Sequence, residues 1–302
     1  MKKFLSPLFL LMGMSAVQAE DVTIYSPDSL MQVTVRENGG TPVYSISYNG
    51  KQMLEDSPLG LTTNVADFTK GLTLKAAPAT RIEDCYSLRN IKTSHAHYVA
   101  NEVKLTLSAG RRRIGVEFRV GNNDVAFRYT LPVWGETRAC VVTDEASGFN
   151  LPDKTTTFLT PQSDAMIGWK RTKPSYEEEY VADAPMTRIS HYGHGFTFPC
   201  LFKVDDDGWV LISETGVDGR YCGSRLSDSR LISTDTAETE DTSDDQLYYS
   251  YKIEYPMAEE NNGNGSVEPG ISLPGATPWR TITLGEDLAP IVETTIAWDV
   301  VD

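Results

Sequence analysis

The sequence is poor in the residues that most often perform chemistry in enzymes. It holds only four histidines and four cysteines in 302 residues. The cysteines are Cys85, Cys140, Cys200 and Cys222, without a Cys-x-x-Cys pair, which argues against a zinc ribbon. Cys200 and Cys222 could form a disulfide in an exported protein, or could be small buried apolar residues. No Gly-x-Ser-x-Gly elbow and no glycine-rich phosphate loop occur, so the usual serine-hydrolase and nucleotide-binding signatures are missing.

Basic residues are few relative to acidic ones. The chain holds 27 lysines and arginines against 42 aspartates and glutamates, and its formal net charge is -15. Nucleic acids and anionic membrane surfaces attract positive patches, so we expect neither as a partner. A neutral ligand such as a sugar, or a cation, fits this charge. The basic run Arg111-Arg112-Arg113 favours a hairpin turn or an interface over a polyanion site.

Long apolar runs are confined to the start of the chain. Two lysines precede an apolar stretch over 4–17, and Val17-Gln18-Ala19 provides small residues where signal peptidase reads the chain. We predict a secretory signal peptide over 1–19, with an uncleaved anchor as the alternative. We predict a single exported, periplasmic domain over 20–302. No later segment has the length of a transmembrane helix, so we expect no membrane span after signal removal.

Apolar and polar residues alternate along most of the chain. Val33 and Val35 alternate before the turn at Asn38-Gly39-Gly40, and a returning strand completes a hairpin. No long window repeats its apolar residues every 3.6 positions, so helices should be few. These features predict an all-β protein built as one large β-sandwich. We also expect a last apolar strand that ends at Trp298, with this tryptophan in the core.

Three consecutive glutamates form the densest polar cluster. Glu177, Glu178 and Glu179 lie between Tyr176 and Tyr180. In an extended strand, the side chains of Glu177 and Glu179 project to one face. A hard cation such as Ca²⁺ would relieve the repulsion between neighbouring carboxylates. A solvated charge run is the alternative interpretation.

Histidines and tryptophans provide further candidates. His95 and His97 would share one face of a strand. An epimerase would need a histidine and a carboxylate to converge on a sugar, and His95, His97, His191 and Glu214 are the candidates. Hydrogen-bonded structural histidines are the alternative. Trp169 lies in a loop rich in glycine, lysine and proline, so it is the tryptophan best placed to stack on a sugar.

The order of several short motifs is informative. Ser57-Pro58-Leu59-Gly60-Leu61 lies near the start and Asp124-Val125-Ala126-Phe127-Arg128-Tyr129 in the middle. Tyr176-Glu177-Glu178-Glu179-Tyr180 follows, and Thr277-Pro278-Trp279-Arg280-Thr281-Ile282 lies near the end. Taken in this order, from about Ile24 to the last residue, these segments resemble the N-terminal domain of glycoside hydrolase family 97.

The resemblance implies an exported bacterial α-glucosidase or α-galactosidase of the kind used in polysaccharide utilisation. Its N-terminal domain is a large β-super-sandwich similar to galactose mutarotase. That domain lines part of the pocket for an α-linked oligosaccharide and contacts a (β/α)₈ catalytic barrel and a C-terminal β-domain. It also supplies one ligand to a Ca²⁺, and the matching position here is Glu177, with Glu178 and Glu179 as alternative registers. Trp169, Tyr180 and Glu214 are the candidates for the sugar pocket.

In this family the carboxylates that cleave the glycosidic bond lie on the barrel, whereas this chain stops at Asp302. We therefore expect a non-catalytic domain that is inactive alone. A stand-alone carbohydrate-binding module and a mutarotase-like epimerase are the alternatives. Binding of oligosaccharides would support the first alternative, and faster interconversion of sugar anomers would support the second.

Overall fold

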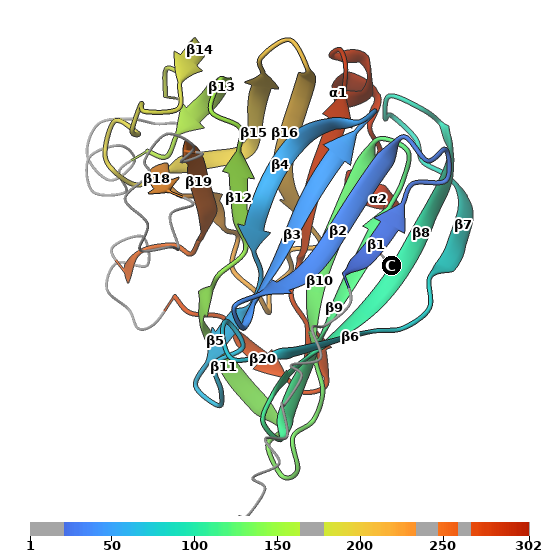
Figure 1. The fold of residues 1–302 in the computed structure, drawn as a ribbon, viewed down its shortest axis with the longest axis vertical. Helices are drawn as coiled ribbons and strands as arrows, with labels where there is room; N and C mark the ends of the chain where they lie inside the picture. The colour runs from blue at the N-terminus through green and yellow to red at the C-terminus, as the bar shows by residue number, and fades with distance from the viewer. Residues whose placement is uncertain (1–20, 164–177, 234–246, 259–266, 302) are drawn as a thin grey trace, which may run out of the picture.

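The computed structural model describes residues 21–163, 178–233, 247–258 and 267–301. Within these residues the chain forms 22 strands and two short helices, and every strand pairing between them is antiparallel. The all-β prediction is confirmed, as is the expectation of few helices (Figure 1). None of the described helices has the length and apolar content that a bilayer crossing requires.

The strands form two main layers that face each other. The first layer contains, in spatial order, β7 (Thr80–Ser87), β8 (His95–Ala109), β9 (Arg112–Val120), β10 (Asp124–Leu131), β22 (Trp279–Gly285), β16 (Gly208–Thr215), β15 (Phe196–Val204), β13 (Thr155–Pro161) and β14 (Val181–Pro185). The second contains β1 (Val22–Tyr25), β2 (Met31–Asn38), β3 (Thr41–Tyr48), β4 (Lys51–Pro58), β12 (Gly148–Leu151), β19 (Leu247–Glu254) and β18 (Arg230–Ser233).

Six short strands complete the sandwich. Three of them attach to the layers: β6 (Thr73–Ala76) beside β8, β21 (Gly275–Ala276) beside β10, and β17 (Arg225–Leu226) between β15 and β19. The other three form a small sheet of β20 (Gly270–Ser272), β11 (Ala139–Glu145) and β5 (Leu61–Thr63). Because β17 pairs with a strand of each layer, it joins the two layers at one end of the sandwich.

The core lies between the layers and follows the alternation in the sequence. Val33 and Val35 of β2 are buried and their neighbours are more exposed, as the two-residue period predicts. Aromatic rings connect the layers: the ring of Tyr44 on β3 lies 5.4 Å from that of Phe127 and 5.9 Å from that of Phe118. Contacts of this kind make one continuous core.

The end of the chain differs from the predicted strand. Residues after β22 form two short helices, α1 (Ala289–Glu293) and α2 (Ile296–Asp299), which pack on the outer side of the first layer (Figure 1). Pro290 in the first turn favours a helix start, because proline fixes φ and lacks the N–H that a strand ladder needs. Trp298 is 41% exposed, so its predicted core position is also wrong.

Asp124 attaches this C-terminal segment to the sheet. Its carboxylate accepts hydrogen bonds from the hydroxyl groups of Thr283 on β22 and Thr294 between the helices. Burial raises the pKa of Asp124 from 3.8 to about 6, although the residue keeps some solvent exposure. The four cysteines are free thiols, so Cys200 and Cys222 are not bridged.

Candidate functional site

One row of side chains across the first layer contains charges where the core should be apolar. Strand register places Val103, Phe118, Phe127, Arg280 and Glu214 side by side on β8, β9, β10, β22 and β16. Residues paired in this way share one face of a sheet, so Arg280 and Glu214 point into the sandwich with the three apolar residues. The guanidinium of Arg280 is completely buried.

Two carboxylates compensate the buried charge of Arg280. Glu145, also completely buried, accepts hydrogen bonds from Nε at 2.9 Å and from Nη2 at 2.7 Å of Arg280. Glu214, whose side chain is 12% exposed, pairs with Nη1 of Arg280. Burial lowers the pKa of Arg280, but the two carboxylates outweigh it and hold the pKa well above its usual value. We call Glu145, Glu214 and Arg280 the charge cluster.

Hydrogen bonds from neighbouring residues complete the charge cluster. Glu145 also accepts a bond of 3.3 Å from the hydroxyl of Tyr255, which lies 2.7 Å from the hydroxyl of Tyr221. Burial raises the pKa of Tyr221 well above its ordinary value, so both phenols stay protonated. Glu214 accepts bonds from the backbone N–H of Ser224 at 2.9 Å and from its hydroxyl at 2.6 Å. The cluster thereby fixes the loop that leads from β16 to Ser224.

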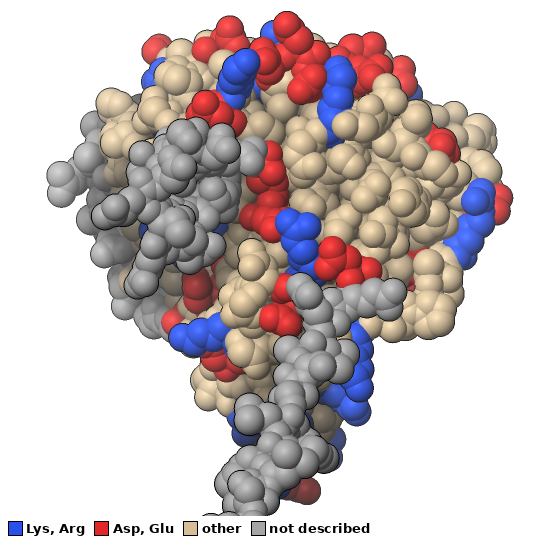
Figure 2. All heavy atoms as spheres, in the orientation of Figure 1, with Lys and Arg blue, Asp and Glu red and all other residues tan. Residues whose placement is uncertain are grey.

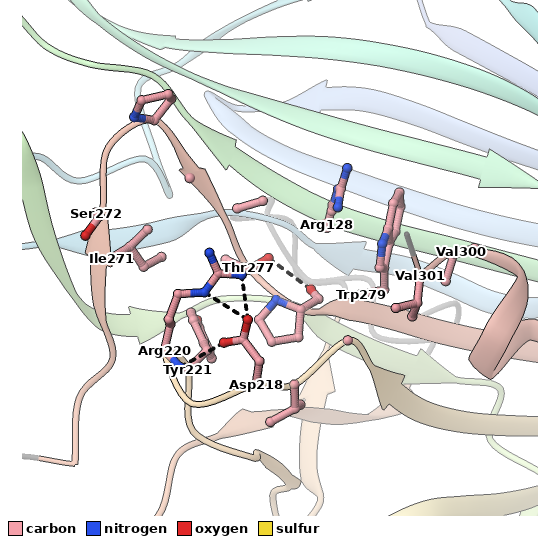
Figure 3. Close-up of a pocket in the computed structure, with 16 residues that line it drawn as sticks. Arg128, Asp218, Arg220, Tyr221, Ile271, Ser272, Thr277, Trp279, Val300 and Val301 are labelled. Atoms are coloured by element: carbon pink, nitrogen blue, oxygen red, sulfur yellow. Dashed lines mark hydrogen bonds and ion pairs between the residues drawn. The ribbon is translucent and has the colours of Figure 1, made fainter.

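This loop forms one wall of a cavity of 390 Å³ (Figure 3). Thr277, Pro278 and Trp279 line it from the start of β22, and Tyr221 lies opposite them. The rim carries Asp218, whose carboxylate accepts a bond of 2.8 Å from Nε of Arg220. The Thr-Pro-Trp-Arg motif thus places its first three residues at the cavity and its arginine in the core behind it.

Trp279 supports this cavity without being open to a ligand. Its side chain is only 2% exposed. The guanidinium carbon of Arg128 lies 4.3 Å from the ring centroid and that of Arg119 lies 4.8 Å away, as expected for cation–π contacts. Arg128 is held in turn by Glu117, which accepts its Nε at 2.7 Å. Trp279 is therefore a structural support rather than a platform for a sugar ring.

The structure describes two of the four predicted site residues, Tyr180 and Glu214. Glu177 and Trp169 lie outside the described residues. Tyr180 is 59% exposed and directly precedes β14, at an edge of the first layer. Glu214 belongs to the charge cluster. Its carboxylate accepts three hydrogen bonds from Ser224 and Arg280, and a fourth bond joins Arg280 to Ser224. Of the two described positions, Tyr180 therefore lies at the edge of the first layer and Glu214 lies on β16, inside the layer.

Two histidines of the epimerase alternative, His95 and His97, are distant from Glu214. His95 and His97 lie on β8, and Glu214 lies on β16, with β9, β10 and β22 between them. Four strand spacings correspond to roughly 19 Å. His97 contacts Glu83 instead, at 2.8 Å. The geometry therefore gives no support to an acid–base pair formed by these residues.

Sequence reasoning missed Glu145 and Arg280. A usable signal was present, because Arg280 is the only charged residue in the run Trp279-Arg280-Thr281-Ile282-Thr283-Leu284. A charged residue at an inward position of a buried strand requires a charged partner. The identity of that partner was hidden, since Glu145 lies 135 residues away in the sequence.

Comparison with known proteins now gives these features a context. The family model described as "Glycosyl-hydrolase 97 N-terminal" matches residues 24–302. The chain belongs to this family. The resemblance seen in the sequence is therefore confirmed, and the charge cluster and its cavity are features of a glycosyl-hydrolase 97 N-terminal domain.

Similar proteins are longer than this domain. A solved β-arabinopyranosidase is 56% identical with a TM-score of 0.84, and the match covers 94% of this chain and 43% of that one. A probable retaining α-galactosidase from Streptomyces bingchenggensis is 26% identical over 268 residues, covering 86% of this chain and 34% of the relative. A family 97 enzyme from Pseudoalteromonas sp. strain K8, solved with panose, shares the fold at 21% identity and a TM-score of 0.72, covering 91% of this chain and 37% of that one. The chain thus spans well under half of each of these proteins.

Proposed function

We propose that this chain is the non-catalytic N-terminal domain of an exported, periplasmic family 97 glycosidase. In that enzyme it lines part of the sugar pocket and supplies one ligand to a shared Ca²⁺. The observation that carries the proposal is the family match over residues 24–302, together with the 43% share of the β-arabinopyranosidase that the chain covers. The remainder of such an enzyme is large enough for a (β/α)₈ barrel with the catalytic carboxylates and for a C-terminal β-domain.

The exposed edge beside β14 supports a contact with a neighbouring domain. Tyr180 is 59% exposed and Val181 is 42% exposed, and Glu179 before them is also exposed. In the described part of the chain, β14 pairs only with β13. An exposed tyrosine offers both an apolar ring and a hydroxyl, which suits a sugar or a domain interface.

Calcium would bind to Glu177 only as an ion shared with other ligands. Ca²⁺ takes six to eight oxygen ligands, whereas one carboxylate supplies at most two. The family resemblance gives Glu177 the role of one carboxylate ligand, and the other ligands would be provided by the barrel. When bound, the ion would supply positive charge beside the sugar.

We further propose a galactose-configured, α-linked substrate. The names of two relatives are chemically compatible, since β-L-arabinopyranose has the ring configuration of α-D-galactopyranose and lacks only its hydroxymethyl group. In the enzyme that carries this domain, the cleavage rates of nitrophenyl α-galactoside, β-L-arabinopyranoside and α-glucoside should differ, with the glucoside slowest. Equal or faster cleavage of the glucoside would exclude this assignment.

The calcium role is tested in the enzyme that carries this domain. Glu177→Gln keeps the size of the side chain and removes its charge. We expect the Ca²⁺ concentration for half-maximal activity to rise by about tenfold or more, as for other lost metal contacts. Glu178→Gln and Glu179→Gln test the alternative registers, and Glu293→Gln, at an exposed glutamate of the C-terminal segment, is the control. An unchanged Ca²⁺ requirement in Glu177→Gln would refute the assignment, and a shift in Glu178→Gln alone would move it to that residue.

A further inference from the structure

The tip of the β8–β9 hairpin carries three adjacent arginines. Arg111 lies in the turn, and Arg112 and Arg113 begin β9. All three are exposed, and Figure 2 shows basic side chains at the lower end of the molecule, where Figure 1 places this hairpin. The predicted hairpin turn is confirmed, but a turn alone does not require three guanidinium groups.

These arginines are three adjacent guanidinium groups, and none of them has an acidic partner among the described residues. Five other arginines pair with carboxylates: Arg36 with Asp56, Arg119 with Glu102, Arg128 with Glu117, Arg220 with Asp218, and Arg280 with Glu145. Within the described ranges, no carboxylate lies at ion-pair distance from Arg111, Arg112 or Arg113. Among the described residues, Arg112 donates only to the backbone oxygen of Val65. In a chain with a net charge of -15, this concentration of unpaired positive charge is a local exception.

A pocket of 600 Å³ adjoins the arginines, and we call it the hairpin pocket. It is lined by the segments 110–113 and 132–135 together with Ser108. Its size lies within the range of about 300–1,000 Å³ that is typical of small-molecule sites. The backbone groups of Gly110 and Gly135 are accessible, since no heavy atom lies within 4 Å of the position that a Cβ atom would take on either glycine.

Trp134 gives the hairpin pocket a rigid aromatic wall. Its ring stacks on Phe68, with centroids 5.7 Å apart and an interplanar angle of 21°. Its Nε1 donates a bond of 2.9 Å to the backbone oxygen of Arg113. The ring is therefore fixed before any ligand arrives, which lowers the entropic cost of binding. The residue keeps partial exposure, so the rest of its surface is available to the pocket.

We propose that the hairpin pocket binds a sugar residue that carries a carboxylate, such as a uronate within an otherwise neutral oligosaccharide. Guanidinium groups recognise carboxylates through paired, charge-assisted hydrogen bonds. The indole of Trp134 contacts the apolar C–H face of the sugar ring. The strongly negative chain repels polyanions, so a single acidic residue suits the site better than a highly charged polymer. Glu136, at the same hairpin as Trp134, is not among the residues that line the pocket.

Calorimetry with the full chain tests the proposal. The probe is a xylo-oligosaccharide with one glucuronate group, and its control is the same molecule with the carboxyl group reduced to an alcohol. The acidic form should bind about tenfold or more tightly, since a charge-assisted bond contributes at least that factor. Raising NaCl from about 0.05 to about 0.5 M should weaken only the acidic form, through screening.

Variants locate the binding. Arg111→Gln combined with Arg113→Gln should remove the preference for the acidic form, whereas Arg81→Gln, on the exposed edge strand β7, should not. Trp134→Leu should weaken both forms, with thermal unfolding as the check on its fold. Equal affinity for both forms, no binding of either, or an equal loss in Arg81→Gln would overturn the proposal. Displacement by millimolar sulfate together with no effect of Trp134→Leu would show a bare anion site, which also overturns it.

Discussion

The charge cluster permits a sharp prediction about stability. Arg280→Met keeps an extended side chain of similar length but leaves two buried carboxylates without a cation. Glu145 is completely buried and would retain only the bond of 3.3 Å from Tyr255. Glu214 would retain both bonds from Ser224. Removing one partner of a buried ion pair costs about 3–5 kcal/mol, and Glu145 should account for most of it.

The magnitude of this loss can be measured by urea unfolding of the wild type and of three variants. We expect Arg280→Met to lower the free energy of unfolding by about 3–5 kcal/mol. The double variant with Glu145→Leu should recover part of the loss, because the unpaired carboxylate is gone. Glu214→Gln alone should cost less, about 1–2 kcal/mol, because its amide keeps an acceptor and can reach Ser224.

The order of the three losses in free energy of unfolding matters as well as their size. If the double variant were less stable than Arg280→Met, an unpaired carboxylate at Glu145 would not be the source of the loss. A loss below about 1 kcal/mol in Arg280→Met would show that the cluster is hydrated or able to rearrange. Either outcome would refute the account of a fully desolvated ion cluster.

Three further predictions concern other parts of the fold. The pKa of Asp124 is raised to about 6, so the contribution of its protonated carboxyl group to the free energy of unfolding is fully present below pH 3.8 and is lost as the pH rises through 6. Asp124→Asn should therefore remove about 1–2 kcal/mol of this pH dependence in unfolding experiments between pH 4 and 7, after allowance for partial exposure. Gly60→Ala should lower the free energy of unfolding by about 2–4 kcal/mol, since Gly60 has a φ of +134° and a Cβ there would overlap the carbonyl of Phe68. Gly50→Ala, with open space around it, should lower it by only about 1 kcal/mol in the same assay. Tyr180→Ala should leave the thermal midpoint unchanged but reduce kcat/KM of the enzyme that carries this domain; unchanged kinetics would exclude a role in the sugar pocket.

The sandwich was predictable because its determinants are local. Two-residue alternation in β2 and β9 and glycine-bearing turns are visible in any short window of the sequence. The C-terminal helices were not predictable in the same way. The segment from Ala289 to Trp298 is apolar enough for a strand, and its helical form depends on Pro290 and on packing against β22.

The charge cluster was hidden for a different reason. Glu145, Glu214 and Arg280 come from three segments that only the sheet register and the facing small sheet bring together. Sequence spacing contains no information about such convergence. Sequence reasoning makes Glu214 a candidate for the sugar pocket, and the structure shows its carboxylate engaged with Arg280 and Ser224.

The two faces of β22 explain why the Thr-Pro-Trp-Arg motif matters for the whole domain. Adjacent residues of a strand point to opposite faces, so Trp279 and Arg280 act on different sides of one sheet. Arg280 holds the charge cluster inside, which orders the loop along the cavity. Trp279 packs with Ile296 and Val300 of the C-terminal segment on the outside. A change in the charge cluster should therefore alter the packing of the C-terminal segment, because Arg280 and Trp279 are joined by a single peptide unit. The core and the outer cavity thus depend on the same two residues of β22.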